Sequence, residues 1–202
     1  MKKLLSVLIL IVSIHFVGLA QSADDYIKSG YEKSRVRNFK GAIEDYNKAI
    51  DMNPVFAEAY FNRGLAKFYL SDKQGTLEDY SMAIQINPQY SKAYSNRGLV
   101  KYQMGDKLGA MADYNKAIEL NPLHSEAYGN RGNAKYQSGD LDGAVADYDH
   151  AVEINPKSPE TYFNRGLAKI QLEDRAGACS DWSKAKELGY PKADELIEKN
   201  CR

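Results

Sequence analysis

One asparagine recurs at a fixed interval along the chain, and its amide is the side chain with the clearest chemistry. It stands at Asn62, Asn96, Asn130 and Asn164, each 34 residues after the last. A carboxamide both donates and accepts hydrogen bonds, so a regular row of amides can pair with the backbone of an extended peptide. This pattern indicates non-covalent recognition. The alternative is that each amide bonds to its own neighbours and serves only the fold.

The two cysteines, Cys179 and Cys201, are the second candidate for chemistry. If the helices on either side of a turn near Gly189 run antiparallel, these cysteines lie ten and twelve residues from the turn and come side by side. An exported chain with an even number of cysteines usually pairs them. The sequence therefore predicts a disulfide between Cys179 and Cys201, and the alternative is two independent thiols.

The other reactive groups form no recognisable site. The three histidines, His15, His124 and His150, belong to no cluster with metal-ligand spacing. The sequence contains neither a glycine-rich phosphate loop nor a nucleophile elbow. We therefore predict no catalytic, metal-binding or cofactor-binding residues, no cofactor, no small-molecule substrate and no enzyme activity.

The composition is that of a folded protein without a nucleic-acid partner. Hydrophobic residues make up 44% of the chain and charged residues 27%, which is typical of soluble domains. Lys+Arg and Asp+Glu both number 27, so the formal net charge is zero. Because nucleic-acid binding requires a basic surface, we expect no nucleic acid among the partners.

The first twenty residues differ from the rest. Lys2 and Lys3 precede an apolar run from Leu4 to Ala20. A basic start, an apolar run and small residues before a cut at Gln21 predict a cleaved signal peptide at 1–20. The alternative is an uncleaved membrane anchor. With cleavage, the chain meets the membrane only transiently, and the mature protein is exported to the periplasm or secreted.

Two further markers keep the interval of 34 residues. The dipeptide Asn-Pro recurs at 53–54, 87–88, 121–122 and 155–156, and each of the four asparagines above begins the tripeptide Asn-Arg-Gly. A fixed period near 34 is typical of stacked helical hairpins. Proline ends the second helix of each hairpin. With the glycine of Asn-Arg-Gly as repeat position 8, a single domain at 21–202 contains these parts: repeats 23–56, 57–90, 91–124, 125–158 and 159–190, and a C-terminal capping helix in 191–202.

Several repeat positions resemble one known family. Most units carry glycine at position 8, alanine at position 20, an aromatic residue at position 24 and proline at position 32. Tyr60, Tyr94, Tyr128 and Tyr162 occupy position 4, where the family pattern W-x2-L-G-x2-Y…A-x3-F…P has tryptophan. The chain thus resembles the tetratricopeptide repeat family over nearly its whole mature length. The resemblance implies an all-α fold, a right-handed α-solenoid of tandem 34-residue helix-turn-helix repeats.

The resemblance also implies where a ligand binds. In this family the first helices line a concave groove, and some members hold an extended peptide with an asparagine ladder at position 6. The predicted peptide-binding residues are Asn62, Asn96, Asn130, Asn164, Asn133, Phe68, Tyr69, Tyr102 and Tyr136. Members that grip a terminal carboxylate need basic residues beside the asparagine. Because position 2 carries glutamate in three units and lysine only at Lys92, we predict no carboxylate clamp.

The departures from the family pattern are charged. Arginine replaces leucine at position 7, lysine replaces tyrosine at position 11, and aspartate stands at position 23. We predict that each arginine pairs with an aspartate, either in its own unit or in the unit before; the alternative is a solvated charged face. Glycine at position 19, near the start of each second helix, predicts the close approach of a neighbouring helix.

Together these features predict a non-catalytic scaffold that binds another protein, or a peptide segment of one, in its groove. The competing hypothesis is a self-associating structural or assembly component of the cell envelope.

Overall fold

The computed structural model describes residues 22–201, so the predicted signal peptide lies outside the described residues. In this range the chain forms eleven helices and no strand. The helices are α1 Ala23–Arg35, α2 Phe39–Met52, α3 Ala57–Tyr69, α4 Lys73–Ile86, α5 Ser91–Gln103, α6 Lys107–Leu120, α7 Ser125–Ser138, α8 Leu141–Ile154, α9 Pro159–Gln171, α10 Arg175–Glu187 and α11 Ala193–Asn200. None of these helices has the length and apolarity needed to cross a membrane.

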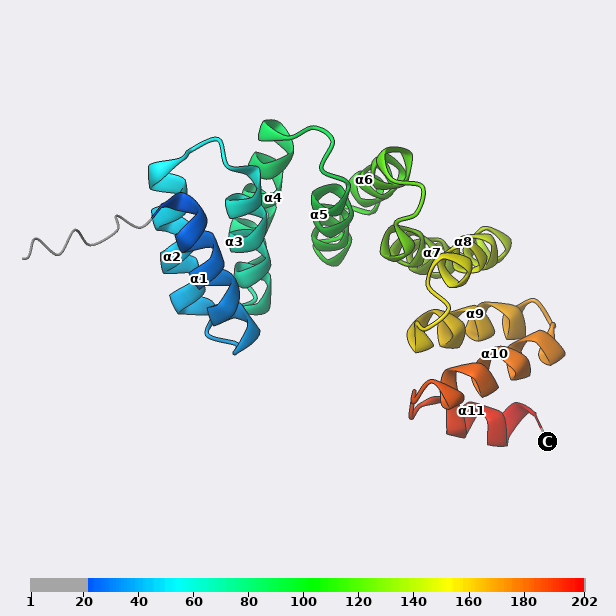
Figure 1. Cartoon of the computed structure of the whole chain (residues 1–202). Helices are drawn as coiled ribbons and strands as arrows, with labels where there is room; N and C mark the ends of the chain where they lie inside the picture. Colours follow the sequence, from blue (N-terminus) through cyan, green and yellow to red (C-terminus); the bar gives the residue numbers. More distant parts are fainter. Residues whose placement is uncertain (1–21, 202) are drawn as a thin grey trace, which may run out of the picture.

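The helices form five hairpins in single file, and the predicted α-solenoid is confirmed. Each first helix packs against the second helix of its own hairpin and against the second helix of the preceding one. Figure 1 shows the hairpins along an arch, with α5 and α7 on its inner side and α6 and α8 on its outer side. The first helices therefore present their free faces to the inside of the bend.

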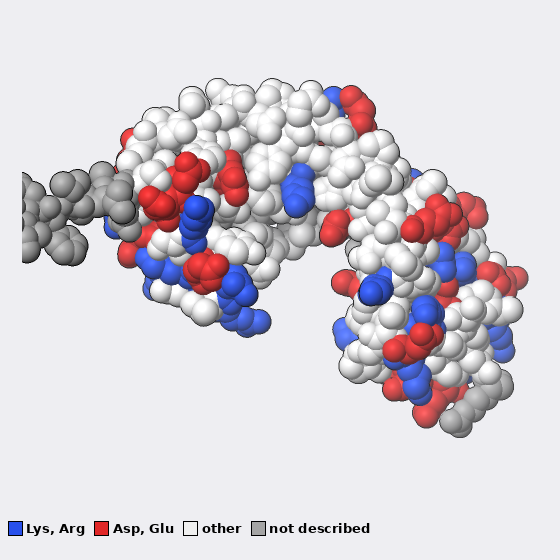
Figure 2. Space-filling view, viewed as in Figure 1, with Lys and Arg blue, Asp and Glu red and all other residues white. Residues whose placement is uncertain are grey.

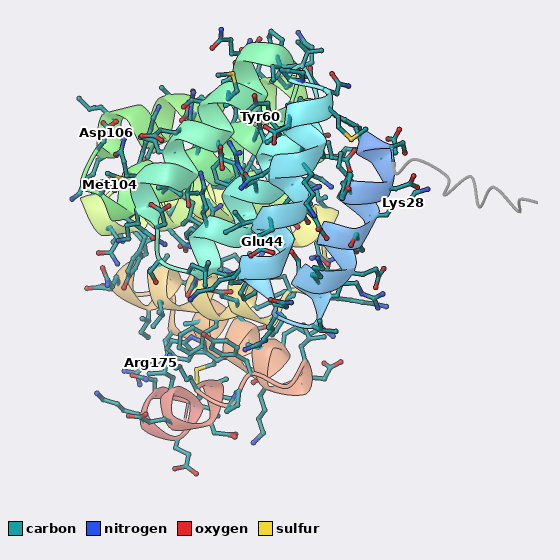
Figure 3. All side chains as sticks on the ribbon, turned by 90° about the vertical axis from the view of Figure 1, so that its left-hand side faces the viewer. Lys28, Glu44, Tyr60, Met104, Asp106 and Arg175 are labelled. Carbon is teal, nitrogen blue, oxygen red and sulfur yellow. A yellow bond between two sulfur atoms is a disulfide. The ribbon has the colours of Figure 1, made fainter. Side chains whose placement is uncertain are left out.

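Local signals define the helix ends as the sequence predicts, except for one detail. The second helices begin after an Asp or Asn whose side chain accepts the backbone N–H of the position-19 glycine, as Asp106 does from Gly109 at 2.8 Å. Asp106 stands at the start of α6, beside Met104 (Figure 3). A Cβ added to Gly109 would lie 2.1 Å from Asp106 Oδ2. The glycine thus makes room for the N-cap carboxylate, and the prediction of a closely approaching neighbouring helix is wrong here.

A different glycine permits the close packing of the two helices in each hairpin. At position 8, a Cβ added to Gly98 would lie 2.8 Å from the ring of Tyr114, the position-24 aromatic of the same unit. Tyr114 is 1% exposed and also belongs to a core cluster with Ala134 of the following unit. Each aromatic residue at this position therefore joins the two helices of its hairpin and reaches the next hairpin.

The last hairpin is closed by α11, as predicted. Ala193 is fully buried against α10, and Leu196 and Ile197 pack on the same cluster. The structure joins Cys179 of α10 to Cys201 at the end of α11, with a Cα–Cα distance of 5.7 Å. The antiparallel course of these two helices about Gly189 thus brings the cysteines together.

Candidate functional site

A buried layer of charge sets the direction in which each first helix faces. Arg63 donates from Nε and Nη2 to the two carboxylate oxygens of Asp79, at 3.0 and 2.6 Å. Lys67, one turn further along the same helix, lies 2.9 Å from Asp79 Oδ2. The Asp79 residue is 3% exposed. A buried carboxylate that accepts two cations fixes both partners, so α3 cannot rotate about its axis without breaking the layer.

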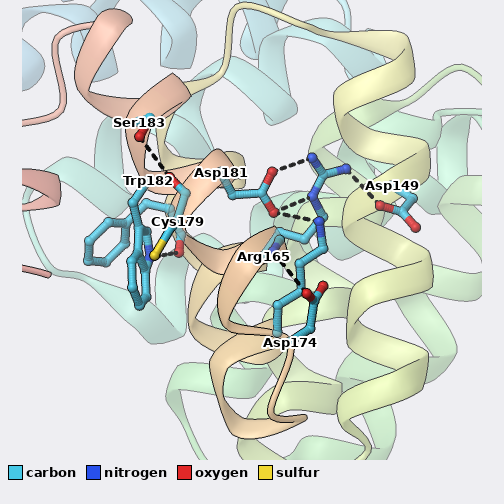
Figure 4. Close-up of polar contacts among 10 residues, drawn as sticks. Asp149, Arg165, Asp174, Cys179, Asp181, Trp182 and Ser183 are labelled. Atoms are coloured by element: carbon cyan, nitrogen blue, oxygen red, sulfur yellow. Dashed lines mark hydrogen bonds and ion pairs between the residues drawn. The ribbon is translucent and has the colours of Figure 1, made fainter. Parts of the chain in front are cut away.

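The same layer recurs in the third, fourth and fifth hairpins, and the predicted arginine–aspartate pairing is confirmed. The partners belong to one unit: Arg63–Asp79, Arg97–Asp113, Arg131–Asp147 and Arg165–Asp181. Each Nη1 also reaches the preceding unit, where it bonds to Asn47, Ser81, Asn115 or Asp149. Figure 4 shows Arg165 between Asp181 and Asp149. The aspartates are buried, so the alternative of a solvated charged face is wrong.

Two further contacts stabilise the arginine in its charged form. The hydrogen bonds to Asp147 raise the pKa of Arg131 against the opposing effect of burial. The Arg131 guanidinium also lies over the ring of Tyr128, with its carbon 5.5 Å from the ring centre. Such cation–π contacts recur in four units and contribute about 0.5–1 kcal/mol each. They explain why tyrosine occupies position 4, a role that the sequence did not suggest.

With the first helices oriented in this way, all nine predicted peptide-binding residues line hollows beside these helices. Asn62 and Tyr69 line a hollow of about 430 Å³ between the first two hairpins. Phe68 and Asn96 line one of about 200 Å³. Tyr102 and Tyr136 line one of about 370 Å³. Asn130 lies in a polar hollow of about 140 Å³, and Asn133 and Asn164 line both of the last two.

The four ladder asparagines are half-buried, but they divide into two kinds. Asn164 donates to Asn133 Oδ1 at 3.0 Å, and that oxygen also accepts from the Tyr148 hydroxyl at 2.7 Å. A hydrogen bond with the Asn96 side chain moderates the effect of burial, which raises the pKa of Tyr80. The amides of Asn62 and Asn130 have no hydrogen-bond partner among the described residues. The first pair thus serves the fold in part, whereas the second pair is available to a ligand.

The hollow between the first two hairpins contains residues that the sequence analysis missed. We call it the N-terminal hollow; its lining residues are Tyr31, Ser34, Arg35, Arg37, Phe39, Tyr46, Asn62, Leu65, Ala66 and Tyr69. One of them, Ser34, stands at repeat position 12, where the other units carry Phe68, Tyr102, Tyr136 or Ile170. A comparison of the five units at this position would have revealed the difference.

The described part of the chain contains no candidate metal site. Within residues 22–201, no group of three or more His, Cys, Asp or Glu side chains could hold a metal ion. His124 is buried, and its Nδ1 lies 2.8 Å from Ser91 Oγ, which donates to the carbonyl of Ala117 at 2.9 Å. This histidine is thus engaged in the packing of two hairpins.

Comparison with known proteins decides the family. A sequence model described as TPR repeat matches residues 38–70 and 132–172, and two described as tetratricopeptide repeat match 91–123 and 113–146. The chain belongs to the tetratricopeptide repeat family. No curated protein sequence shows a significant match to it.

Solved structures of other tetratricopeptide-repeat proteins share the fold. A crystal structure of MamA has a TM-score of 0.69 at 25% identity, with 82% of this chain and 96% of that chain covered. YrrB, described as "a TPR protein with an unusual peptide-binding site", has a TM-score of 0.66 at 21% identity and 89% and 93% coverage. PilF of Pseudomonas aeruginosa has a TM-score of 0.77 at 18% identity, covering 83% and 76%. These likenesses show that the fold is shared.

Proposed function

We propose that this tetratricopeptide-repeat protein is a non-catalytic scaffold that holds an extended segment of a partner protein in its groove. The observation that carries the proposal is the pair of half-buried amides of Asn62 and Asn130, which have no partner in the described protein and line the groove. A half-buried amide without a partner loses part of its hydration and gains no bond in return. A peptide backbone supplies both the acceptor and the donor that such an amide lacks.

The aromatic residues of the groove add apolar contact to these hydrogen bonds. Tyr69 stacks on Phe39 with ring centres 4.7 Å apart and is 60% exposed. Phe68 and Tyr102 contribute further apolar surface to the neighbouring hollows. Hydrogen bonds of about 0.5–1.5 kcal/mol each, with some aromatic contact, support modest and reversible binding. YrrB, which shares the fold, has a peptide-binding site, and this likeness supports the same role.

A random peptide library presented to the chain from residue 21 onward tests the proposal. We expect enriched peptides whose binding is lost when Asn96 and Asn130 are both replaced by alanine, because the second of these amides is free and the first faces the neighbouring hollow. The matched control replaces Gln85 and Gln89, two exposed amides outside the hollows, by alanine. Binding that survives the double asparagine variant would exclude recognition by the ladder.

Self-association is the competing function, and exposed apolar side chains away from the groove favour it. Val55, Leu108 and Leu123 are 71%, 86% and 73% exposed. Scattering at several protein concentrations separates the two functions. A scaffold stays monomeric and binds peptides, whereas an assembly component grows in mass with concentration.

We also propose that the protein acts outside the cytosol. The basic and apolar residues between Lys2 and Ala20 support export, and so does the cysteine pair, because disulfides persist in oxidising compartments. Fractionation of cells followed by N-terminal sequencing tests this. A mature chain that begins near Gln21 in the exported fraction is expected, and an intact Met1 in the cytosol would contradict it.

A further inference from the structure

The N-terminal hollow lies where the first hairpin has a small residue, Ser34, at repeat position 12. In the second hairpin, Phe68 occupies repeat position 12 and is half-buried in the core around Phe61. In the first hairpin, Ser34 at the same position leaves its hydroxyl 3.4 Å from that of Tyr46 and fills little of the space. The resulting volume is about 430 Å³, which is within the range of protein ligand sites.

The walls of this hollow suit an aromatic ring. Phe39 and Tyr69 form one wall as a stacked pair with an interplanar angle of 11°. Tyr31 is 54% exposed, and Leu65 and Ala66 add apolar surface. Aromatic rings prefer such offset or edge contacts with other rings, and each such pair adds to the free energy gained from burial.

The rim of this hollow is basic. Arg35 and Arg37 both line it, and no aspartate or glutamate does. Figure 2 shows basic side chains gathered at the lower end of the arm that the first hairpins form. Arg35 has an ion pair with Glu32 at 3.2 Å, but both side chains are about two-thirds exposed, so this pair is easily exchanged. Arg37 has no ion-pair partner among the described residues.

Acidic side chains line a different hollow. Glu126 and Glu160, both at repeat position 2, line the polar hollow near Asn130, and no lysine or arginine does. An acidic peptide residue is therefore attracted to the rim with Arg35 and Arg37 and repelled from the polar hollow.

We propose that the N-terminal hollow takes an aromatic side chain that has a carboxylate side chain next to it in the partner's extended segment. The ring occupies the space that Ser34 leaves open, and the carboxylate pairs with Arg35 and Arg37. This inference rests on the proposed function and specifies the chemistry of the partner. The recognised group is an internal acidic residue, so a free C-terminus is not required.

Fluorescence anisotropy with three end-blocked peptides tests the chemistry. The first peptide has a phenylalanine between glutamates, the second replaces the phenylalanine by glycine, and the third replaces the glutamates by lysine. We expect the first to bind at least about tenfold more tightly than the second, because an aromatic side chain is buried. The first peptide should also bind more tightly than the third, and this difference in affinity should shrink as the salt concentration is raised, because exposed charges are screened. Equal binding of all three would overturn the inference.

Variants of the protein test the location. Ser34→Phe fills the hollow with the side chain of the second hairpin, and we expect about a tenfold loss of affinity for the first peptide. Ser34→Ala keeps the space open and should bind as the parent does. Arg37→Ala should weaken binding about two- to fivefold. Arg175→Ala should not, because Arg175 is at the start of α10, in the arm of the arch opposite α1 and α3 (Figure 1). Circular dichroism and the melting midpoint check that each variant is folded.

The outcomes separate this inference from the proposed function. If library peptides bind through Asn96 and Asn130 but Ser34→Phe leaves their affinity unchanged, the hollow is not a subsite and the groove proposal stands. If Ser34→Phe abolishes binding of the first peptide while the double asparagine variant retains it, the hollow is the site and the ladder is not.

Discussion

The second and fifth hairpins, called outer here, are packed differently from the third and fourth, called central. In the second hairpin Phe61, at repeat position 5, packs on Tyr90 with ring centres 4.9 Å apart, and in the fifth Phe163 packs on Tyr190 at 4.7 Å. In the third and fourth hairpins, position 5 is Ser95 and Gly129. The Ser95 hydroxyl is buried without a partner, and an added Cβ on Gly129 would meet nothing within 4 Å. The aromatic contacts of the second and fifth hairpins are thus absent from the third and fourth, and open space lies beside Gly129.

The arginine–aspartate layer, in contrast, is the same in the second, third, fourth and fifth hairpins. The shortest arginine–aspartate distances are 2.6, 2.7, 2.6 and 2.5 Å along the chain. The two sets of contacts therefore have separate roles. The ionic layer fixes which face each first helix shows to the groove, and the aromatic contacts hold the ends of the array together. Gly129, which stands where the second and fifth hairpins have phenylalanine, lines the polar hollow beside Asn130.

Removing an outer aromatic residue should have the largest effect. Phe61→Ala is expected to lower the free energy of unfolding by about 3–5 kcal/mol, because it leaves a cavity in a well-packed core. Ser95→Ala at the equivalent central position should be neutral or slightly stabilising, because it removes a buried hydroxyl that has no partner. Urea unfolding of the two variants measures both values. Similar losses for the two would remove the distinction between outer and central hairpins.

Removing the disulfide at the C-terminal end should lower the free energy of unfolding by nearly as much as Phe61→Ala does. Cys201→Ser opens a link that spans 22 residues, and the loop-entropy estimate for such a link is about 3 kcal/mol. The loss should be confined to α10 and α11, so amide exchange should rise there first. Mass spectrometry of the unreduced protein shows whether the bond is present. Two free thiols in the isolated protein would contradict this prediction.

Breaking the ionic layer should lower the free energy of unfolding equally in the fourth hairpin and in the second. Arg131→Met is expected to destabilise the protein by about 1–3 kcal/mol, because it leaves buried Asp147 with Lys135 as its remaining cation. Arg63→Met in the second hairpin should destabilise the protein by a similar amount. Thermal melting compares them with Arg175→Met, an exposed control. If the melting midpoint of Arg131→Met equals that of the parent, the layer contributes nothing to stability.

The fold was predictable from the sequence because it repeats. A marker such as Asn-Arg-Gly indicates the same local structure at each of its four copies, so the copies support one another. The pairing of Arg131 with Asp147 was predicted, but the choice of unit was not, because it depends on the rise between hairpins. The reason for Gly109 was misjudged because a helix cap and a close helix contact select the same residue type.

The residues of the candidate site were predicted from the sequence, but which of their amides already have a hydrogen-bond partner was not. Asn130 and Asn164 occupy the same repeat position, yet only Asn164 bonds to Asn133, which belongs to the unit before it. That difference depends on leucine being replaced by Asn133 at one copy of position 9, and on distances across the boundary between units. The N-terminal hollow likewise contains one departure from the repeat, the small residue Ser34 at position 12.

Two glycines of the same central helix should respond in opposite ways to alanine. Gly129→Ala is expected to stabilise the protein by up to about 1 kcal/mol, because alanine favours helix and the site is open. Gly132→Ala should destabilise it by about 1–3 kcal/mol, since the added Cβ would lie 2.8 Å from the Tyr148 ring. Chemical unfolding measures both. A destabilising Gly129→Ala would show that the centre is packed more tightly than we infer.

The smallest expected effect is a pH dependence of the central packing at His124. Burial lowers the pKa of this histidine; Glu126, 3.6 Å from Nε2, opposes the shift, and Lys92 adds to it. The unfolded chain titrates near the ordinary value of 6.5, so it takes up the proton first as the pH falls. The stability linked to His124 is therefore present above about pH 6.5 and is lost as the pH falls through that value toward the lower folded pKa. His124→Gln should lose less stability than the parent between pH 7.5 and pH 5, with the difference measured by urea unfolding. Identical pH profiles would mean that the proton is accommodated without loosening the central hairpins, and the contrast with the aromatic ends would then rest on shape alone.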